Sequence, residues 1–262
     1  MADKEANLTT QTPPLAPGSA FLTYMESGFP QIAGWPGQPS SVIFMAHFKE
    51  LFERHGVTGG ACEIGVHHGK YLIALHNILA PARSLGIDVF DDQDKNVDGS
   101  GKGSYDLTRA YVDSFVADPD SVALMSKDSL TLNAADQAEI LAEYGRFAFF
   151  SIDGGHTAQH ITYDFFLASE LTSPYGIIAV DDMFHPDWPG VTEGILAALA
   201  TRRSPFVPLF LTRKKLMLCH FSVAKPYHDF ILGICRDVYK FDPTMVTLCG
   251  HAIPSLNFGS EY

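Results

Sequence analysis

The sequence has few cysteines, few basic residues and no long apolar run. Its four cysteines include no Cys-x-x-Cys pair, which excludes a zinc ribbon and a disulfide framework and predicts reduced thiols in a cytoplasmic protein. The 262 residues carry 18 basic and 30 acidic side chains, a formal net charge of −12. Nucleic acids and anionic membrane surfaces attract a positive field, so we expect neither as a partner. We also expect no transmembrane segment and no signal peptide.

The chain divides by composition into four parts. Residues 1–18 are polar and contain three prolines, so we expect a disordered arm. Residues 19–41 mix aromatic residues with Gly and Pro, and we expect a cap or lid without regular structure there. Residues 42–222 have the regular patterns of one α/β domain. Residues 223–262 form a C-terminal extension, with a helix and then an irregular tail, which packs either on the site or on a second subunit of a homo-oligomer.

Apolar runs of strand length alternate with helical patterns through the main domain. We expect strands at 61–64, 84–90, 121–126, 147–153 and 176–182, and helices at 42–55, 70–79, 105–117, 134–144, 158–171 and 191–202. A late hairpin turns at Thr212–Lys214. This order predicts the α/β class, with a doubly wound, mostly parallel, seven-stranded sheet (Rossmann-like) and an antiparallel edge strand.

The turn after the first expected strand suits a bound cofactor. Ligands of open α/β sheets bind at the carboxyl ends of the strands. Glu63, Gly65 and Gly69 form an E-x-G-x-x-x-G turn, in which glycines let a ligand approach the backbone, and His67 would contact the ligand through its backbone. An ordinary tight turn is an equal alternative. The dinucleotide fingerprint G-x-G-x-x-G is absent, which disfavours an NAD-dependent dehydrogenase.

Two further strand ends offer weaker signals for a nucleoside. Asp88 lies about 20 residues beyond the glycine turn, where a carboxylate would accept both ribose hydroxyls. Asp128 and Ser129 follow the third expected strand and could contact an adenine amino group. A solvated acid at the strand end is the alternative for Asp88.

Three acids at neighbouring strand ends predict a cation site. Asp153 ends the fourth expected strand, and Asp181 and Asp182 end the fifth. Carboxylates this close repel one another unless a cation neutralises them, and oxygen ligands suit Mg²⁺. No basic residue lies near these motifs in sequence, although helix caps or pairs with Lys or Arg remain the alternative.

A histidine follows the first of these acids. Only two glycines separate Asp153 from His156, so the imidazole should lie beside the metal and could act as a general base. The alternative is a helix N-terminal residue that bonds the backbone. A polar loop at 94–106 has Asp94, Asn96 and Asp98 at calcium-loop spacing, but Tyr105 stands where a bidentate Glu is required, so we interpret it as a loop near cofactor or substrate.

The motifs "EIGVHHGK", "GIDVF", "SIDGGHT" and "AVDDMFHPDWPGVTEG" together resemble the class I S-adenosylmethionine-dependent methyltransferases. More narrowly, they resemble the metal-dependent O-methyltransferases of the macrolide-sugar type, which act on mycinamicin and macrocin. The resemblance covers roughly residues 60–220. It implies that Asp153, Asp181 and Asp182 hold Mg²⁺ and that His156 is the general base. Relatives often have Glu where this chain has Asp181.

We therefore expect a Mg²⁺-dependent O-methyltransferase that uses S-adenosylmethionine. Its partner would be a small hydroxylated substrate, such as a sugar or a natural-product glycoside. Two alternatives stay open: a catechol-type O-methyltransferase, which usually has a lysine base, and a non-catalytic S-adenosylmethionine-binding protein.

Overall fold

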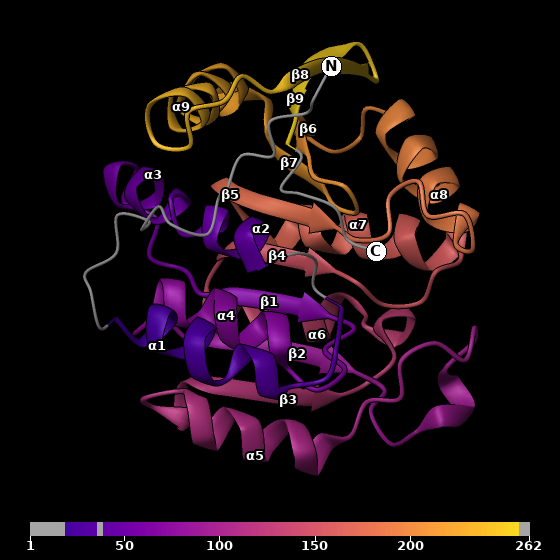
Figure 1. Cartoon of the computed structure of the whole chain (residues 1–262). Coiled ribbons are helices and arrows are strands. Elements are labelled where there is room, and N and C mark those ends of the chain that lie inside the picture. Colours follow the sequence, from indigo (N-terminus) through magenta and orange to yellow (C-terminus); the bar gives the residue numbers. More distant parts are fainter. Residues whose placement is uncertain (1–18, 36–38, 257–262) are drawn as a thin grey trace.

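A single nine-stranded sheet runs through the structure, a computed structural model that describes residues 19–35 and 39–256. The strand order is β3-β2-β1-β4-β5-β7-β6-β9-β8 (Figure 1). The strands are β1 (Ala61–Ile64), β2 (Ser84–Asp88), β3 (Val122–Ser126), β4 (Phe147–Ile152), β5 (Thr172–Val180), β6 (Phe206–Leu211), β7 (Leu216–His220), β8 (Thr244–Leu248) and β9 (His251–Ser255). The α/β class and the mostly parallel sheet are confirmed, but the predicted number of seven strands is wrong.

Helices connect the strands and cover both faces of the sheet. They are α1 (Ala20–Ser27), α2 (Pro39–Met45), α3 (Phe48–Arg54), α4 (Lys70–Leu79), α5 (Tyr105–Phe115), α6 (Ala134–Tyr144), α7 (Ala158–Leu171), α8 (Pro189–Ala200) and α9 (Ala224–Asp237). Short 3₁₀ turns are η2 (Phe29–Gln31), η3 (Gln93–Lys95), η4 (Pro119–Ser121), η5 (Ser129–Thr131) and η6 (Phe221–Val223).

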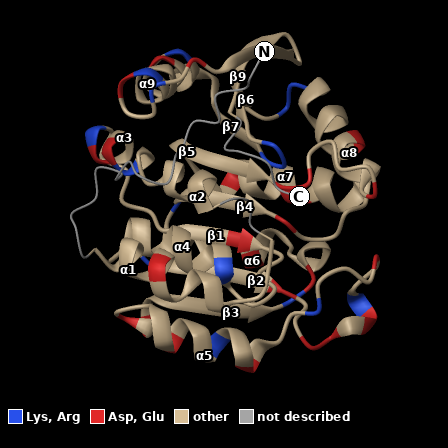
Figure 2. Ribbon diagram, viewed as in Figure 1, with Lys and Arg blue, Asp and Glu red and all other residues tan. Residues whose placement is uncertain are grey.

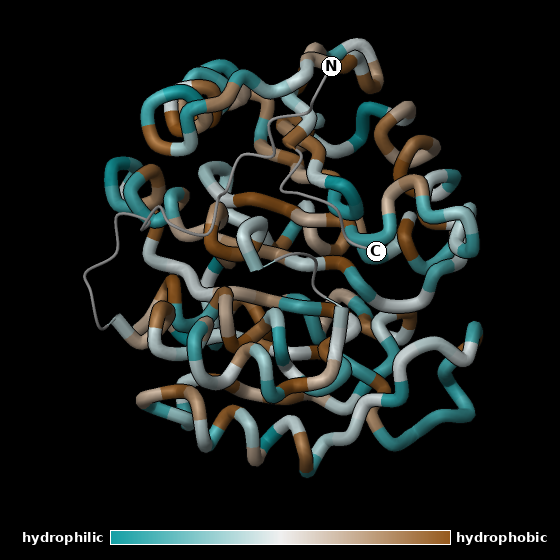
Figure 3. The backbone as a smooth tube through the Cα atoms, in the orientation of Figure 1, coloured by the Kyte–Doolittle hydropathy of each residue, from teal (hydrophilic) through white to brown (hydrophobic). Residues whose placement is uncertain are grey.

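The sheet separates two apolar cores, because neighbouring strand residues point to opposite faces. On one side, α1 to α5 and α9 pack around residues such as Phe48 and Phe149. On the other side, α6, α7 and α8 pack around Phe150, Phe165 and Ile195. Figure 3 shows apolar segments along the central strands and on parts of the surrounding helices. The strand ends are thereby fixed in place, and the loops beyond them can carry polar groups.

The five strands β3, β2, β1, β4 and β5 are parallel, so their carboxyl ends meet at one edge of the sheet. Strand β7 is antiparallel to β5, with Val180 opposite Leu216. The start of β7 therefore lies next to the end of β5. This places the β6–β7 turn at the same edge as the strand-to-helix loops.

The two additional strands come from the segment that was expected to be an irregular tail. Strands β8 and β9 form a hairpin, and β9 joins β6 through Leu211 and Ser255. The turn has positive φ at both Cys249 and Gly250, as the type I′ turn of a two-residue hairpin requires. Most of β8 is exposed or half-buried, which explains its weak hydrophobic pattern.

Two other expectations differ from the structure. The helix expected at 42–55 is two helices, α2 and α3, interrupted around Ala46 and His47, where the buried His47 ring lies 3.1 Å from the Tyr239 hydroxyl. The segment 19–41 does contain regular structure, because α1 and η2 pack apolar residues on the core. The proposed arm at 1–18 lies outside the described residues. Among the helices described, none is both long and apolar enough to cross a membrane.

Candidate active site

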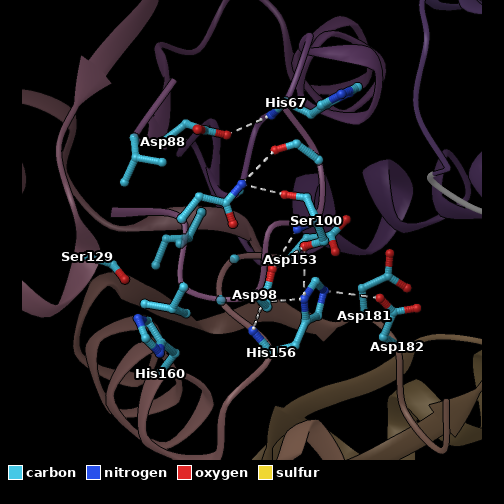
Figure 4. Close-up of a pocket in the computed structure, with 18 of the residues that line it drawn as sticks. His67, Asp88, Asp98, Ser100, Ser129, Asp153, His156, His160, Asp181 and Asp182 are labelled. Atoms are coloured by element: carbon cyan, nitrogen blue, oxygen red, sulfur yellow. Dashed lines mark hydrogen bonds and ion pairs between the residues drawn. The ribbon is translucent and has the colours of Figure 1, made fainter. Parts of the chain in front are cut away.

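A cavity of about 510 Å³ opens at the carboxyl edge of the parallel strands. Its walls come from the loops after β1, β2, β3, β4 and β5 and from the β6–β7 turn. Acidic residues occur in these loops (Figure 2), and Figure 4 draws 18 of the lining residues in close-up and labels ten of them. Of the residues expected to form the site, the lining includes Gly65, His67, Asp88, Asp128, Ser129, Asp153, His156, Asp181 and Asp182.

One end of the cavity is built on Asp88. Its Oδ2 accepts a hydrogen bond from the backbone N–H of His67 at 2.8 Å, and its Oδ1 accepts one from Phe90 at 2.6 Å. Burial raises the pKa of Asp88, although these bonds oppose the shift. The carboxylate thus links the β1 and β2 turns (Figure 4) and lies at the cavity wall.

Gly65 lies where the neighbouring strands β1 and β4 end, in close contact with the backbone of the residue that follows β4. It has a φ of +83°, and a Cβ atom there would lie 1.9 Å from the carbonyl oxygen of Asp153. Only glycine allows both the conformation and this close approach. The same residue therefore shapes the turn and fixes the position of Asp153.

Two of the residues expected to contact a cofactor do not line the cavity. Glu63 is buried within β1, and burial raises its pKa to about 8. Gly69 caps α4 with a φ of +83°, against Thr108. Ser129 does line the cavity, next to Asp128, whose Oδ1 accepts the N–H of Leu130.

The other end of the cavity brings Asp153, His156 and Asp182 together. One ligand atom from each lies within 4.8 Å of the others, and no other set of this kind is found within residues 19–35 and 39–256. Burial raises the pKa of Asp153 well above its usual value, and the charge of Asp181 adds to this effect. Such a set of oxygen and nitrogen donors could hold a divalent cation.

Asp181 has a different partner. Its Oδ2 lies 2.6 Å from Nζ of Lys215, a side chain only 4% exposed, and that ammonium is 3.9 Å from Asp153. Burial alone would lower the pKa of Lys215, but the charges of Asp181 and Asp153 outweigh this and raise it. Two of the three carboxylates expected to share one cation, Asp153 and Asp181, therefore lie beside the ammonium of Lys215. Lys215 is far from Asp153 and Asp181 in the sequence, but it lies next to them in the structure.

His156 is held on three sides. Its Nδ1 lies 2.8 Å from Oδ2 of Asp98, and its Nε2 lies 3.2 Å from Oδ2 of Asp182. The ring stacks on Trp188 with centroids 4.4 Å apart. Burial opposes protonation of His156, but hydrogen bonds to Asp182 and Asp98 prevail and raise its pKa. The imidazole is thus fixed at the cavity wall (Figure 4).

Backbone strain is concentrated at this edge of the sheet. His67, Phe90 and Asp182 follow β1, β2 and β5 closely, and each has a φ near +50°. This conformation costs non-glycine residues about 1–3 kcal/mol each and is typical of functional sites. The surrounding packing therefore holds these turns in one arrangement.

Three site residues were not identified from the sequence. Asp98 was assigned only to a polar loop, and Lys215 and Lys214 only to a hairpin. Lys214 lines the cavity, and Lys215 is buried behind it. The acidic spacing at 94–98 was the one available signal, and it pointed to calcium instead of to a contact with His156.

The chain matches a known protein family over part of its length. Residues 62–183 match a family described as "Methyltransferase domain". No curated protein matches the chain.

Solved structures share the fold. The O-methyltransferase NovP is 15% identical, with a TM-score of 0.55, over 69% of this chain and 79% of NovP. An O-methyltransferase from Bacillus cereus, solved with S-adenosylhomocysteine (SAH), is 16% identical, with a TM-score of 0.51, over 78% of this chain and 92% of its own. MycE of the mycinamycin pathway reaches a TM-score of only 0.46, so the narrower resemblance is not confirmed. Residues 62–183 thus resemble a methyltransferase domain, and the solved structures share the fold of the chain.

Proposed function

We propose that this protein is a metal-dependent O-methyltransferase that moves the methyl group of S-adenosylmethionine to a hydroxyl of a small acceptor, such as a sugar or a natural-product glycoside. One observation carries the proposal: Asp153, His156 and Asp182 converge at one end of a cavity whose other end is built on Gly65 and Asp88. A methyl donor at the Asp88 end and a hydroxyl at the His156 end would meet inside this cavity.

Asp153 and Asp182 are the proposed ligands of a divalent cation such as Mg²⁺. The donor set fits, because two carboxylates within a few ångströms attract a hard cation. A bound cation would lower the pKa of an acceptor hydroxyl. Asp181 is ion-paired with Lys215, so it would contribute negative charge behind the site and would not bind the cation directly.

His156 is the proposed general base. In the neutral ring, a proton on Nδ1 is held by Asp98, which leaves the lone pair of Nε2 on the side of Asp182 and the cavity. Nε2 can then accept the proton of the acceptor hydroxyl. Stacking on Trp188 keeps the ring from turning away.

Cofactor binding is assigned to the opposite end. The Asp88 carboxylate would accept ribose hydroxyls, Gly65 allows close approach of the backbone, and Asp128 and Ser129 would face the base. S-adenosylmethionine would supply a methyl group on its sulfonium sulfur: transfer to the acceptor would form an oxygen–methyl bond, break the sulfur–methyl bond and release SAH, while the hydroxyl proton would go to His156. Because Glu63 is buried and does not line the cavity, we assign it to support of the turn and not to direct contact with the cofactor.

A lysine base of the catechol type is disfavoured by the ion pair of Lys215. Its raised pKa keeps the ammonium protonated, so it cannot accept a proton. A non-catalytic S-adenosylmethionine-binding protein stays as the alternative, and turnover decides between the two.

The test combines binding and turnover. Calorimetry should detect binding of SAH and none of NAD. Transfer of a labelled methyl group to a panel of sugar, glycoside and phenolic acceptors should stop with a chelator and resume with Mg²⁺. His156→Ala should retain SAH affinity and lose about 10²- to 10⁴-fold in kcat. His251→Ala, in the β8–β9 hairpin and away from the cavity, is the control. Full turnover by His156→Ala would exclude the base assignment.

A further inference from the structure

The loop between β2 and α5 lines the cavity and contacts the turn after β4. Its Asp98 is the point of contact: Oδ2 accepts the backbone N–H of His156 at 2.9 Å and lies 2.8 Å from Nδ1 of the same residue. One carboxylate oxygen therefore fixes both the backbone and the ring of His156 (Figure 4).

Asp98 is itself held in place by its own loop. Its Oδ1 accepts a hydrogen bond from the backbone N–H of Ser100 at 2.9 Å and from the Ser100 hydroxyl at 2.5 Å. The side chain of Asn96 donates to the carbonyl of Ser100 at 2.7 Å and accepts the N–H of Gly99 at 3.1 Å. These bonds stiffen the segment without any ligand. Burial raises the pKa of Asp98, but the bonds from Ser100 and His156 prevail and lower it to about 2, so the group is an acceptor only.

The remaining sides of the ring leave one nitrogen for chemistry. Trp188 covers one face of His156, and the Ser100 hydroxyl lies 3.2 Å from Nδ1, next to Asp98. Nε2 faces Asp182 and the cavity. Both ring nitrogens face carboxylates, which can only accept hydrogen bonds when ionised, so the doubly protonated ring donates to Asp98 and to Asp182. When the ring loses one proton, the shorter contact, 2.8 Å from Nδ1 to Asp98 compared with 3.2 Å from Nε2 to Asp182, favours retention of the proton on Nδ1.

We propose that Asp98 is a positioning residue that selects the Nδ1–H form of His156 and aims Nε2 at the acceptor site. The assignment rests on the proposed function, in which His156 is the base. It gives the β2–α5 loop a task that neither the methyltransferase family nor the acidic cluster implies. The residues at calcium-loop spacing instead stabilise the loop and its contact with His156. Asn96 forms hydrogen bonds within the loop, and Asp98 forms them both within the loop and with His156.

A carboxylate in this position matters because the two nitrogens of imidazole are not equivalent. Without an acceptor at Nδ1, the neutral ring can carry its proton on Nε2, and that nitrogen can no longer accept one. Loss of the orienting carboxylate of a histidine base lowers kcat by up to about 10⁴-fold. We expect a fall of about 10²- to 10⁴-fold in kcat for Asp98→Asn, with little change in SAH affinity, because Asp98 lies at the base end of the cavity.

The experiment compares Asp98→Asn with Asp94→Asn in the full-length chain. Asp94 lies in the same loop and is exposed, so the second variant changes the charge equally without touching His156. Nitrogen-15 NMR of the ring at alkaline pH, with chelator present, should show the Nδ1–H form in the wild type and in Asp94→Asn. Asp98→Asn should show Nε2–H, since the amide can donate to Nδ1. An unchanged ring form in Asp98→Asn, or an equal fall in kcat in Asp94→Asn, would overturn the proposal.

Two further measurements keep the outcome decisive. Ser100→Ala removes a bond to Asp98 but leaves the carboxylate, so we expect it to lower kcat less than Asp98→Asn does. Thermal melting and SAH titration of each variant show whether the protein is still folded and binds SAH. A variant that passes both tests but has lost activity has a wrongly oriented His156 ring and not a disrupted loop. Because the NMR result requires neither acceptor nor metal, an Nδ1–H ring in a protein without methyl transfer would reject the proposed function and still support the role of Asp98.

Discussion

Replacing Lys215 with methionine should destabilise the fold strongly. Its Nζ lies 2.6 Å from Asp181 and 3.9 Å from Asp153, and both members of the closer pair have side chains no more than 5% exposed. Removing one partner of a buried ion pair costs about 3–5 kcal/mol, because the remaining charge has no compensation. For a chain of this size, that loss lowers Tm by about 6–20 °C.

A double-mutant cycle isolates the pair. Asp181→Asn removes the negative charge with little change of shape, so Lys215→Met/Asp181→Asn should recover about half of the lost stability or more. We expect a coupling energy of about 2–3 kcal/mol in urea unfolding with chelator present. Lys214→Met, one residue earlier in the same turn and half-buried, should stay within about 0.5 kcal/mol of the wild type. The reasoning would be refuted if Lys215→Met and Lys214→Met lost the same free energy of unfolding, or if the losses of Lys215→Met and Asp181→Asn simply added in the double variant.

Two more variants test the edge of the sheet. Gly65→Ala should lose at least about 2 kcal/mol more than Gly56→Ala: both positions have positive φ, but only at Gly65 does a Cβ meet backbone, 1.9 Å from the Asp153 carbonyl. Chemical unfolding measures both; similar losses would show that the contact relaxes easily. Burial raises the pKa of Asp164 to about 7, so the wild type should lose stability from about pH 4 to pH 7 as the unfolded chain ionises first. Asp164→Asn should therefore be more stable relative to the wild type at pH 8 than at pH 5, and a pH-independent difference would contradict the shift.

Most of the parallel sheet could be predicted from the sequence because its strands are buried on both faces. The strands Phe147–Ile152 and Ala61–Ile64 are buried throughout, mostly apolar, and followed by glycines or acids, so their type and order were predictable. The β8–β9 hairpin was missed because it is an edge element with one wet face, and its Cys-Gly turn is not a common hairpin signal.

The site was predictable where function depends on strand ends, and unpredictable where it depends on loop contacts. Asp153 and Asp182 come together because β4 and β5 are parallel neighbours, which the alternation of elements implies. The contact between Asp98 and His156 joins residues 58 positions apart through a loop of irregular shape. Lys215 reaches Asp181 only because β7 runs antiparallel to β5, and sequence patterns do not fix which strand follows β5 in the sheet.

The reversal of β7 has a consequence for how such a protein can change. Val180 pairs with Leu216 across β5 and β7. The four-residue hairpin turn Thr212–Lys215 therefore lies next to the strand-to-helix loops that form the cavity. A turn of this kind can exchange residues without altering sheet register or helix packing. Local substitutions in this turn can therefore change the positive charge behind Asp153 and Asp181 and leave the Asp88 end of the cavity intact.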